Sequence, residues 1–120
     1  MTAALGEPFA SAAEAWFWTM EALRARHIGS QWRAATRERP CSPDDVLKAL
    51  DRLYRQRAID LADAELLRRY GERGYAPSPP VAAERADRLV WDRIMGRLEA
   101  ALQARGIVRR PEQTETRRVA

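Results

Sequence analysis

The sequence is poor in the side chains from which catalytic and metal sites are usually built. Its 120 residues include one cysteine, Cys41, and one histidine, His27. One thiol can form neither an internal disulfide nor a thiolate metal site, which is typical of a reducing cytoplasm. Nucleophilic catalysis needs a base, usually histidine, beside the nucleophile, and we expect His27 to be an ordinary residue near a helix end. The sequence therefore predicts no enzyme activity, no cofactor and no metal.

Long apolar runs are also missing. The longest apolar stretch is far shorter than the roughly 20 residues of a membrane-spanning helix. The opening residues, MTAALGEPFA, lack the basic and apolar regions of a secretory signal. We expect a cytoplasmic protein with no membrane partner.

The composition is that of a charge-rich helical domain, with 46% hydrophobic and 32% charged residues. The net charge is +4, and among 21 basic residues only Lys48 is a lysine. This arginine bias is more typical of a GC-rich genome than of selection for phosphate binding. The 17 acidic residues are interspersed with the basic ones, whereas a dedicated DNA-binding domain concentrates its positive charge on one side.

Helix start and stop signals divide the chain into four main helices. Ser11 followed by Glu14 predicts a capping box and a helix to about residue 26. Ser42 before Pro43 predicts the second start, and Asp60 the third. Gly71 and Gly74 should end the third helix. The last helix should run from about Pro80 to about Arg105, and Gly106 with Ile107 predicts a Schellman-type ending.

These signals predict an all-α fold, a small bundle or orthogonal array of four main helices. We expect one helical domain over residues 1–108, with a loosely ordered lead over 1–10, and a disordered C-terminal tail over 109–120. Ile28 and Trp32 could anchor the less regular stretch that follows the first helix. Apolar residues at helical spacing predict the buried face of each helix. These residues are Ala12, Trp16, Met20, Leu23 and His27; Val46, Leu47, Leu50, Leu53 and Tyr54; Leu66, Leu67 and Tyr70; and Ala83, Ala86, Val90, Trp91, Ile94, Leu98, Ala101 and Leu102.

Two apolar side chains are left over by this assignment. Trp18 points away from the face that carries Trp16, and Leu89 lies outside the apolar face of the last helix. Either the N-terminal lead or residues 28–40 cover Trp18, or it belongs to a partner or dimer surface, where aromatic anchors concentrate. Leu89 is a second candidate for such a surface.

Arginines accumulate on the third and fourth helices. Arg93 and Arg97 are like charges four residues apart, an unfavourable spacing unless an anion or an acid lies nearby. They either lie on an ordinary solvated face or contact phosphate or an acidic partner. The candidate nucleic-acid-binding residues are Arg68, Arg69, Arg73, Arg85, Arg88, Arg93 and Arg97.

The run PDDVLKALDRLYRQRAIDLADAELLRRYGERG, with VWDRIMGRLEAALQARGIV after it, resembles a family of short proteins of alphaproteobacteria and their phages. That family is a domain of unknown function, so the resemblance implies an origin and no mechanism. Separately, residues 65–72 are similar to the opening helix of the helix-turn-helix in sigma-factor region 4, and residues 87–98 to its recognition helix. This second resemblance implies DNA contacts by Arg85, Arg88, Arg93 and Arg97. Against it, the helix between them would contain three prolines, and proline inside a helix costs about 3 kcal/mol.

Two functions follow as hypotheses. The first is a non-enzymatic nucleic-acid-associated or regulatory protein of bacterial or phage origin. The alternative is a protein-interaction module or oligomer that binds no nucleic acid. Arginines of the third and fourth helices that converge into one stripe would favour the first; arginines that are scattered and matched by acids would favour the second.

Overall fold

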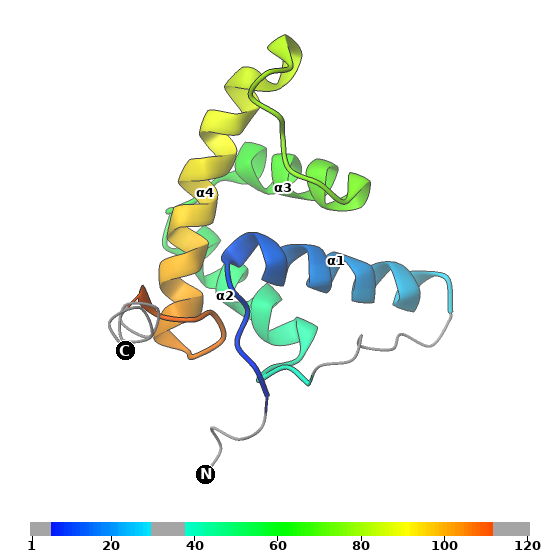
Figure 1. Ribbon diagram of the computed structural model, residues 1–120, viewed down its shortest axis with the longest axis vertical. Helices are drawn as coiled ribbons and strands as arrows, with labels where there is room; N and C mark the ends of the chain where they lie inside the picture. Colours follow the sequence, from blue (N-terminus) through cyan, green and yellow to red (C-terminus); the bar gives the residue numbers. More distant parts are fainter. Residues whose placement is uncertain (1–5, 30–37, 112–120) are drawn as a thin grey trace, which may run out of the picture.

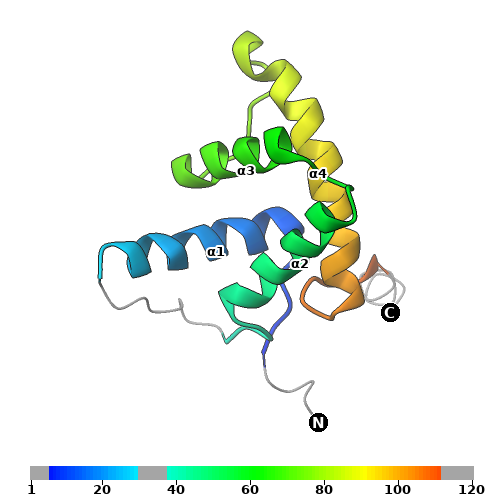
Figure 2. The same ribbon diagram turned by 180° about the vertical axis from the view of Figure 1, so that it is seen from behind.

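The computed structural model describes residues 6–29 and 38–111, and these ranges confirm the predicted all-α fold. The helices are α1 (Ala12–His27), α2 (Pro43–Arg55), α3 (Leu61–Arg73) and α4 (Arg85–Ala104), with a short 3₁₀ turn, η2 (Ala82–Glu84), leading into α4. Helices α1 and α3 lie beside one another and run away from α4 at a steep angle (Figures 1 and 2). Helix α2 packs against both α1 and α4. The arrangement is an orthogonal array rather than a parallel bundle.

The first three predicted helix starts are correct, and hydrogen bonds at the caps stabilise them. The fourth is wrong: the last helix was expected to start near Pro80, but α4 begins at Arg85, after the 3₁₀ turn, and its N-cap makes no side-chain hydrogen bond. The Ser11 hydroxyl accepts from the Glu14 N–H at 3.2 Å, and the Ser42 N–H donates to the Asp45 carboxylate at 2.9 Å. At α3 the capping box is complete: the Asp60 N–H donates to Asp63 and the Asp63 N–H donates to Asp60. Such caps satisfy backbone N–H groups that the helix itself leaves unpaired.

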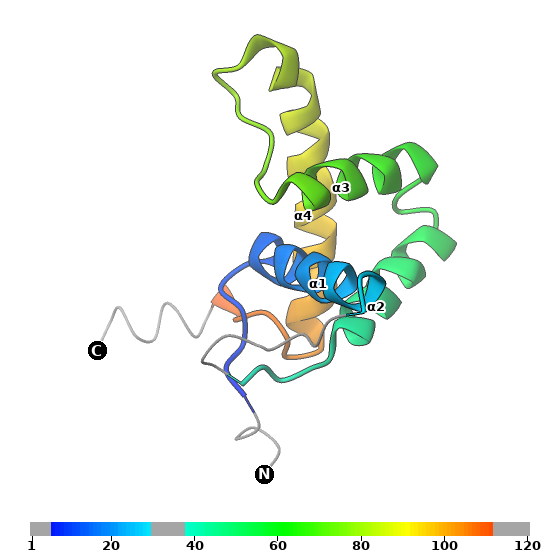
Figure 3. The same cartoon turned by 90° about the vertical axis from the view of Figure 1, so that its right-hand side faces the viewer.

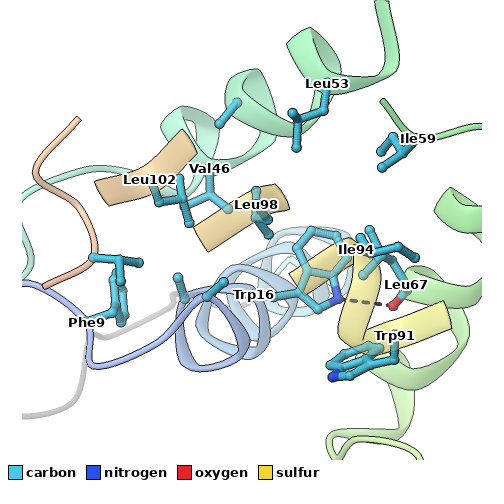
Figure 4. Close-up of a cluster of buried hydrophobic side chains, with 14 of the residues drawn as sticks. Phe9, Trp16, Val46, Leu53, Ile59, Leu67, Trp91, Ile94, Leu98 and Leu102 are labelled. Atoms are coloured by element: carbon cyan, nitrogen blue, oxygen red, sulfur yellow. Dashed lines mark hydrogen bonds between the residues drawn. The ribbon is translucent and has the colours of Figure 1, made fainter. Parts of the chain in front are cut away.

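One apolar core joins all four helices (Figure 4). Trp16 lies at its centre, where its indole N–H donates to the Leu67 carbonyl of α3 at 3.0 Å. The core residues labelled in Figure 4 are Phe9, Trp16, Val46, Leu53, Ile59, Leu67, Trp91, Ile94, Leu98 and Leu102.

The predicted buried face of α1 was wrong at its C-terminal end. The helix buries Ala12, Ala15, Trp16, Thr19 and Ala22, whereas His27 is exposed and Met20 and Leu23 are only half-buried. Small side chains at 15, 19 and 22 let α1 approach its neighbours closely. The Thr19 hydroxyl is satisfied within the helix by donating to the Ala15 carbonyl at 2.8 Å. Ile28, expected to anchor on the core, is exposed, and Trp32 lies outside the described residues.

The expected loose lead also needs correction, because its described part belongs to the core. Phe9 is fully buried, and its N–H and carbonyl bond Ile107 and Arg109 in a short parallel bridge to the C-terminal segment. Arg39 stacks on the Phe9 ring at 4.1 Å. The packed structure thus continues through Arg109, past the predicted boundary at 108, and residues 112–120 of the expected tail lie outside the described ranges.

Gly71 was predicted to end α3 together with Gly74. That prediction was wrong for Gly71, which lies inside the helix. A Cβ atom at Gly71 would lie 2.8 Å from the Trp16 indole nitrogen and 2.7 Å from Cγ of Met20. Glycine here is what lets α1 and α3 touch. The helix ends at Gly74, whose left-handed backbone (φ 93°) makes the predicted C-cap.

The first turns of α4 extend beyond α3 into solvent (Figure 3). For that reason Ala83 and Ala86 are exposed, contrary to the predicted buried face, while Trp91, Ile94, Leu98 and Leu102 are buried as predicted. The Schellman-type ending is confirmed: Gly106 has φ 76° and the Ile107 N–H donates to the Leu102 carbonyl at 2.9 Å.

Candidate functional site

Five of the seven candidate arginines form ion pairs with acids of the same chain. Arg69 bonds Asp87 at 3.3 Å, Arg88 bonds Asp92 at 2.9 Å, and Arg68 lies between Glu65 and Glu72. The remaining two of the five are Arg73 with Glu84 and Arg93 with Asp63. Only Arg68 and Arg88 pair within their own helix. The other three tie α3 to the segment that follows it.

Arg73 holds the proline-rich loop in place. Its guanidinium donates two hydrogen bonds to Glu84, at 2.7 and 2.9 Å, and stacks 4.0 Å from the Tyr75 ring and 4.6 Å from the Tyr70 ring. Glu84 also accepts from the Ser78 N–H at 2.7 Å. Arg73, and after it the Ser78 N–H, lower the pKa of Glu84 to about 2. Arg73 therefore stabilises the contact between the end of α3 and the loop that follows it.

Arg93 reaches across to the N-terminus of α3. It donates to the buried Asp63 at 2.6 Å. Burial by itself raises the pKa of Asp63, but the hydrogen bonds from the Asp60 N–H and from Arg93 outweigh burial and lower that pKa below its ordinary value. The unfavourable spacing of Arg93 and Arg97 predicted a nearby anion or acid, and for Arg93 that acid is Asp63 of the same chain.

Arg85 and Arg97 remain without an acidic partner among the described residues. Arg85 donates only to the Pro79 carbonyl, at 3.2 Å, and Arg97 makes no hydrogen bond or ion pair there. Residues 75–81, between α3 and η2, form no helix. In this part of the chain, then, α3 and α4 are joined by an extended loop rather than by the middle helix of a helix-turn-helix.

The two left-over apolar residues lie in different surroundings. Trp18 is half-buried and packs its ring 5.1 Å from that of Phe9, so the N-terminal lead covers part of it. Leu89 is 72% exposed, as its position outside the apolar face predicted. Their roles as partner contacts remain predictions.

The apolar surface that the sequence did not reveal lies between α2 and α3. Of the five apolar residues predicted to be buried on α2, Val46 and Leu53 are buried, but Leu47, Leu50 and Tyr54 are only partly covered or exposed. Two adjoining hollows of about 330 and 710 Å³ open there. We call this surface the α2–α3 groove; its apolar lining is Leu47, Leu50, Tyr54, Ile59, Leu61, Ala62 and Ala64.

The rim of the α2–α3 groove carries both signs of charge. Asp51 and Arg55 form an ion pair at 3.0 Å, and Asp60 caps α3. Arg57 has a left-handed backbone, φ 63°, which is rare for a residue other than glycine. Arg57 lines the groove, and its guanidinium makes no hydrogen bond or ion pair with a described residue. A wide apolar stripe on α2 and a leucine directly after the Asp60 cap are the sequence signals that could have indicated this groove.

His27 and Cys41 are the single histidine and the single cysteine of the sequence. His27 is exposed at the end of α1. Burial, and after it the charge of Asp45, raises the pKa of the Cys41 thiol to about 11, so the thiol is protonated at neutral pH and is a poor nucleophile. Within residues 6–29 and 38–111, no three His, Cys, Asp or Glu side chains lie close enough together to hold a metal ion. None of the helices described there has the length and apolar character to span a bilayer.

Comparison of the chain with protein-family models, with curated proteins and with solved structures found no match.

Proposed function

We propose that this chain is a non-enzymatic protein-interaction module and that the α2–α3 groove is its working surface. One observation carries the proposal. Five of the seven candidate arginines of α3 and α4 are paired with acids of the same chain, while apolar side chains beside α2 and α3 are left open. The lone Cys41 is in keeping with a cytoplasmic location.

The charge balance argues against phosphate as the ligand. The seven candidate arginines are accompanied by six acids that bond five of them directly. Nucleic-acid affinity comes largely from released counterions, which requires a concentrated positive potential. Here a phosphate approaching Arg69, Arg73 or Arg93 would also meet the carboxylate that each of them already bonds.

The apolar surface argues for a protein. Leu61 is 71% exposed and lies next to the partly covered Leu47 and Leu50. Contiguous exposed apolar surface of this kind marks interaction sites more often than single exposed leucines do. Tyr54, at the junction of the two hollows, is of the residue type that is enriched among interface hot spots.

Site-specific photo-crosslinking tests the proposal. Tyr54 is replaced by p-benzoylphenylalanine in a bacterial host, and the matched control carries the same residue at Ala100, on the outer side of α4. We expect a protein adduct at position 54 and a much weaker one at position 100, each identified by mass spectrometry. A nucleic-acid adduct, or no adduct at position 54, would contradict the proposal.

A further inference from the structure

The α2–α3 groove places an exposed leucine at the edge of an apolar hollow. Leu61 is the first residue of α3 and its side chain is 71% exposed. It stands at the edge of the hollow of about 330 Å³ whose apolar lining includes Leu50, Ile59 and Ala64. A patch that carries both an exposed leucine and an open apolar hollow can pair with itself, since a two-fold interface joins the same patch on both subunits.

The charges around the groove are also self-complementary. Two acids, Asp51 and Asp60, and two arginines, Arg55 and Arg57, line it, although the chain as a whole carries +4. A strongly acidic or strongly basic partner would bind best to a rim whose charges all have the opposite sign. Because Asp51 and Arg55 already bond each other at 3.0 Å, Arg57 and Asp60 are the two rim charges left to pair across an interface between copies, with Arg57 of one copy opposite Asp60 of the other.

The second exposed leucine lies in surroundings that oppose self-pairing. Leu89 stands on the outer side of α4 near Arg85 and Arg93. Arg93 already bonds Asp63, but Arg85 has no acidic partner among the described residues. A two-fold contact through this side would bring Arg85 of one copy toward Arg85 of the other, and like charges across an interface are unfavourable.

We infer that two copies of this chain pair through the α2–α3 groove, with Leu61 of each copy inserted into the hollow of the other. This inference rests on the proposed function and names its partner as a second copy. Tyr54 and Leu50 line the contact, and the unengaged guanidinium of Arg57 supplies an ion pair across it.

Sedimentation equilibrium from micromolar to millimolar concentration tests the inference, with the full chain and matched variants. Leu61→Glu places a charge in the hollow but leaves the fold intact, because an acid in the first turn favours a helix. The dimer contains two copies of Leu61, and each hot spot loses about tenfold in affinity or more. We expect the dissociation constant to rise about hundredfold. Leu89→Glu, the same change at an equally exposed leucine, should leave it unchanged.

A second variant, Arg57→Gly, distinguishes an effect on dimer affinity from an effect on the stability of the fold. Glycine relieves the left-handed backbone at φ 63°, so the melting temperature of the diluted monomer should rise while the dimer weakens about tenfold. A purely structural role for Arg57 would not produce opposite changes.

Three results would overturn the inference: a wild-type chain that is monomeric at millimolar concentration, a Leu61→Glu variant that pairs as tightly as the wild type, or a Leu89→Glu variant that does not pair. An adduct of Tyr54 with a different protein would then still support the proposed function, and the absence of any protein adduct would remove both.

Discussion

Replacing each of two helical glycines by alanine tests how closely α1 and α3 pack. Alanine in a helix interior is favoured over glycine by about 1 kcal/mol. At Gly96, on the exposed side of α4, a Cβ would meet nothing within 4 Å, so Gly96→Ala should stabilise the fold by about 0.5–1 kcal/mol. At Gly71 the same Cβ would lie 2.8 Å from the Trp16 indole nitrogen, and this clash should reverse the sign.

The magnitude at Gly71 follows from two costs. Forcing a methyl group into a packed contact costs about 1–3 kcal/mol. Moving the indole also weakens its buried hydrogen bond to the Leu67 carbonyl, which costs about 1 kcal/mol. The same carbonyl is the one that accepts from the N–H of residue 71 in an α-helix. The gain in helix propensity of about 1 kcal/mol offsets part of these costs, so Gly71→Ala should destabilise the fold by about 1–3 kcal/mol.

Urea unfolding followed by circular dichroism measures both changes. The two variants should move the unfolding free energy in opposite directions and differ by about 1.5–4 kcal/mol, which is on the order of 10 °C in melting temperature. If Gly71→Ala stabilises as much as Gly96→Ala, α1 and α3 do not touch as described.

Three further predictions concern other parts of the fold. The pKa of Glu84 is about 2 in the folded chain and 4.5 ordinarily, so its ion pair with Arg73 stabilises the fold fully above pH 4.5, and this stabilisation is lost as the pH falls toward 2. In acid unfolding, Glu84→Gln should therefore be less stable than the wild type at pH 7 and equally stable near pH 2. Alkylation of Cys41, whose pKa is about 11, should be slow at pH 7.5 and still accelerate tenfold per pH unit up to pH 10, whereas a plateau near pH 8.5 would refute its burial. Phe9→Ala should cost about 3 kcal/mol in urea unfolding if the lead belongs to the core, and a cost below about 1 kcal/mol would show that it does not.

Local signals predicted most of the fold because helix caps act within a few residues. Ser42, Asp60 and Gly106 each mark a boundary by hydrogen bonds to nearby backbone, and each does so in the structure. The burial of Phe9 was missed because it depends on a partner segment about a hundred residues away. Gly71 was read as a helix end because only the neighbouring α1 gives it another reason to be glycine.

The candidate site was harder to predict for the same reason. The sequence identified the arginines, but their partners are distant: Asp63 lies 30 residues from Arg93 and Asp87 lies 18 from Arg69. Pattern alone could not assign these pairs. The α2–α3 groove was hidden because the apolar stripe of α2 is wider than the core it covers, and periodicity does not say which edge stays open.

A dilution series of ¹H–¹⁵N spectra tests the central claim, that two copies of this chain meet at the α2–α3 groove. Amide shifts that change with concentration should cluster at Leu47, Tyr54, Arg57 and Leu61 and leave the outer side of α4 around Leu89 unchanged. Shifts centred on α4, or a spectrum that does not vary with concentration, would contradict the claim.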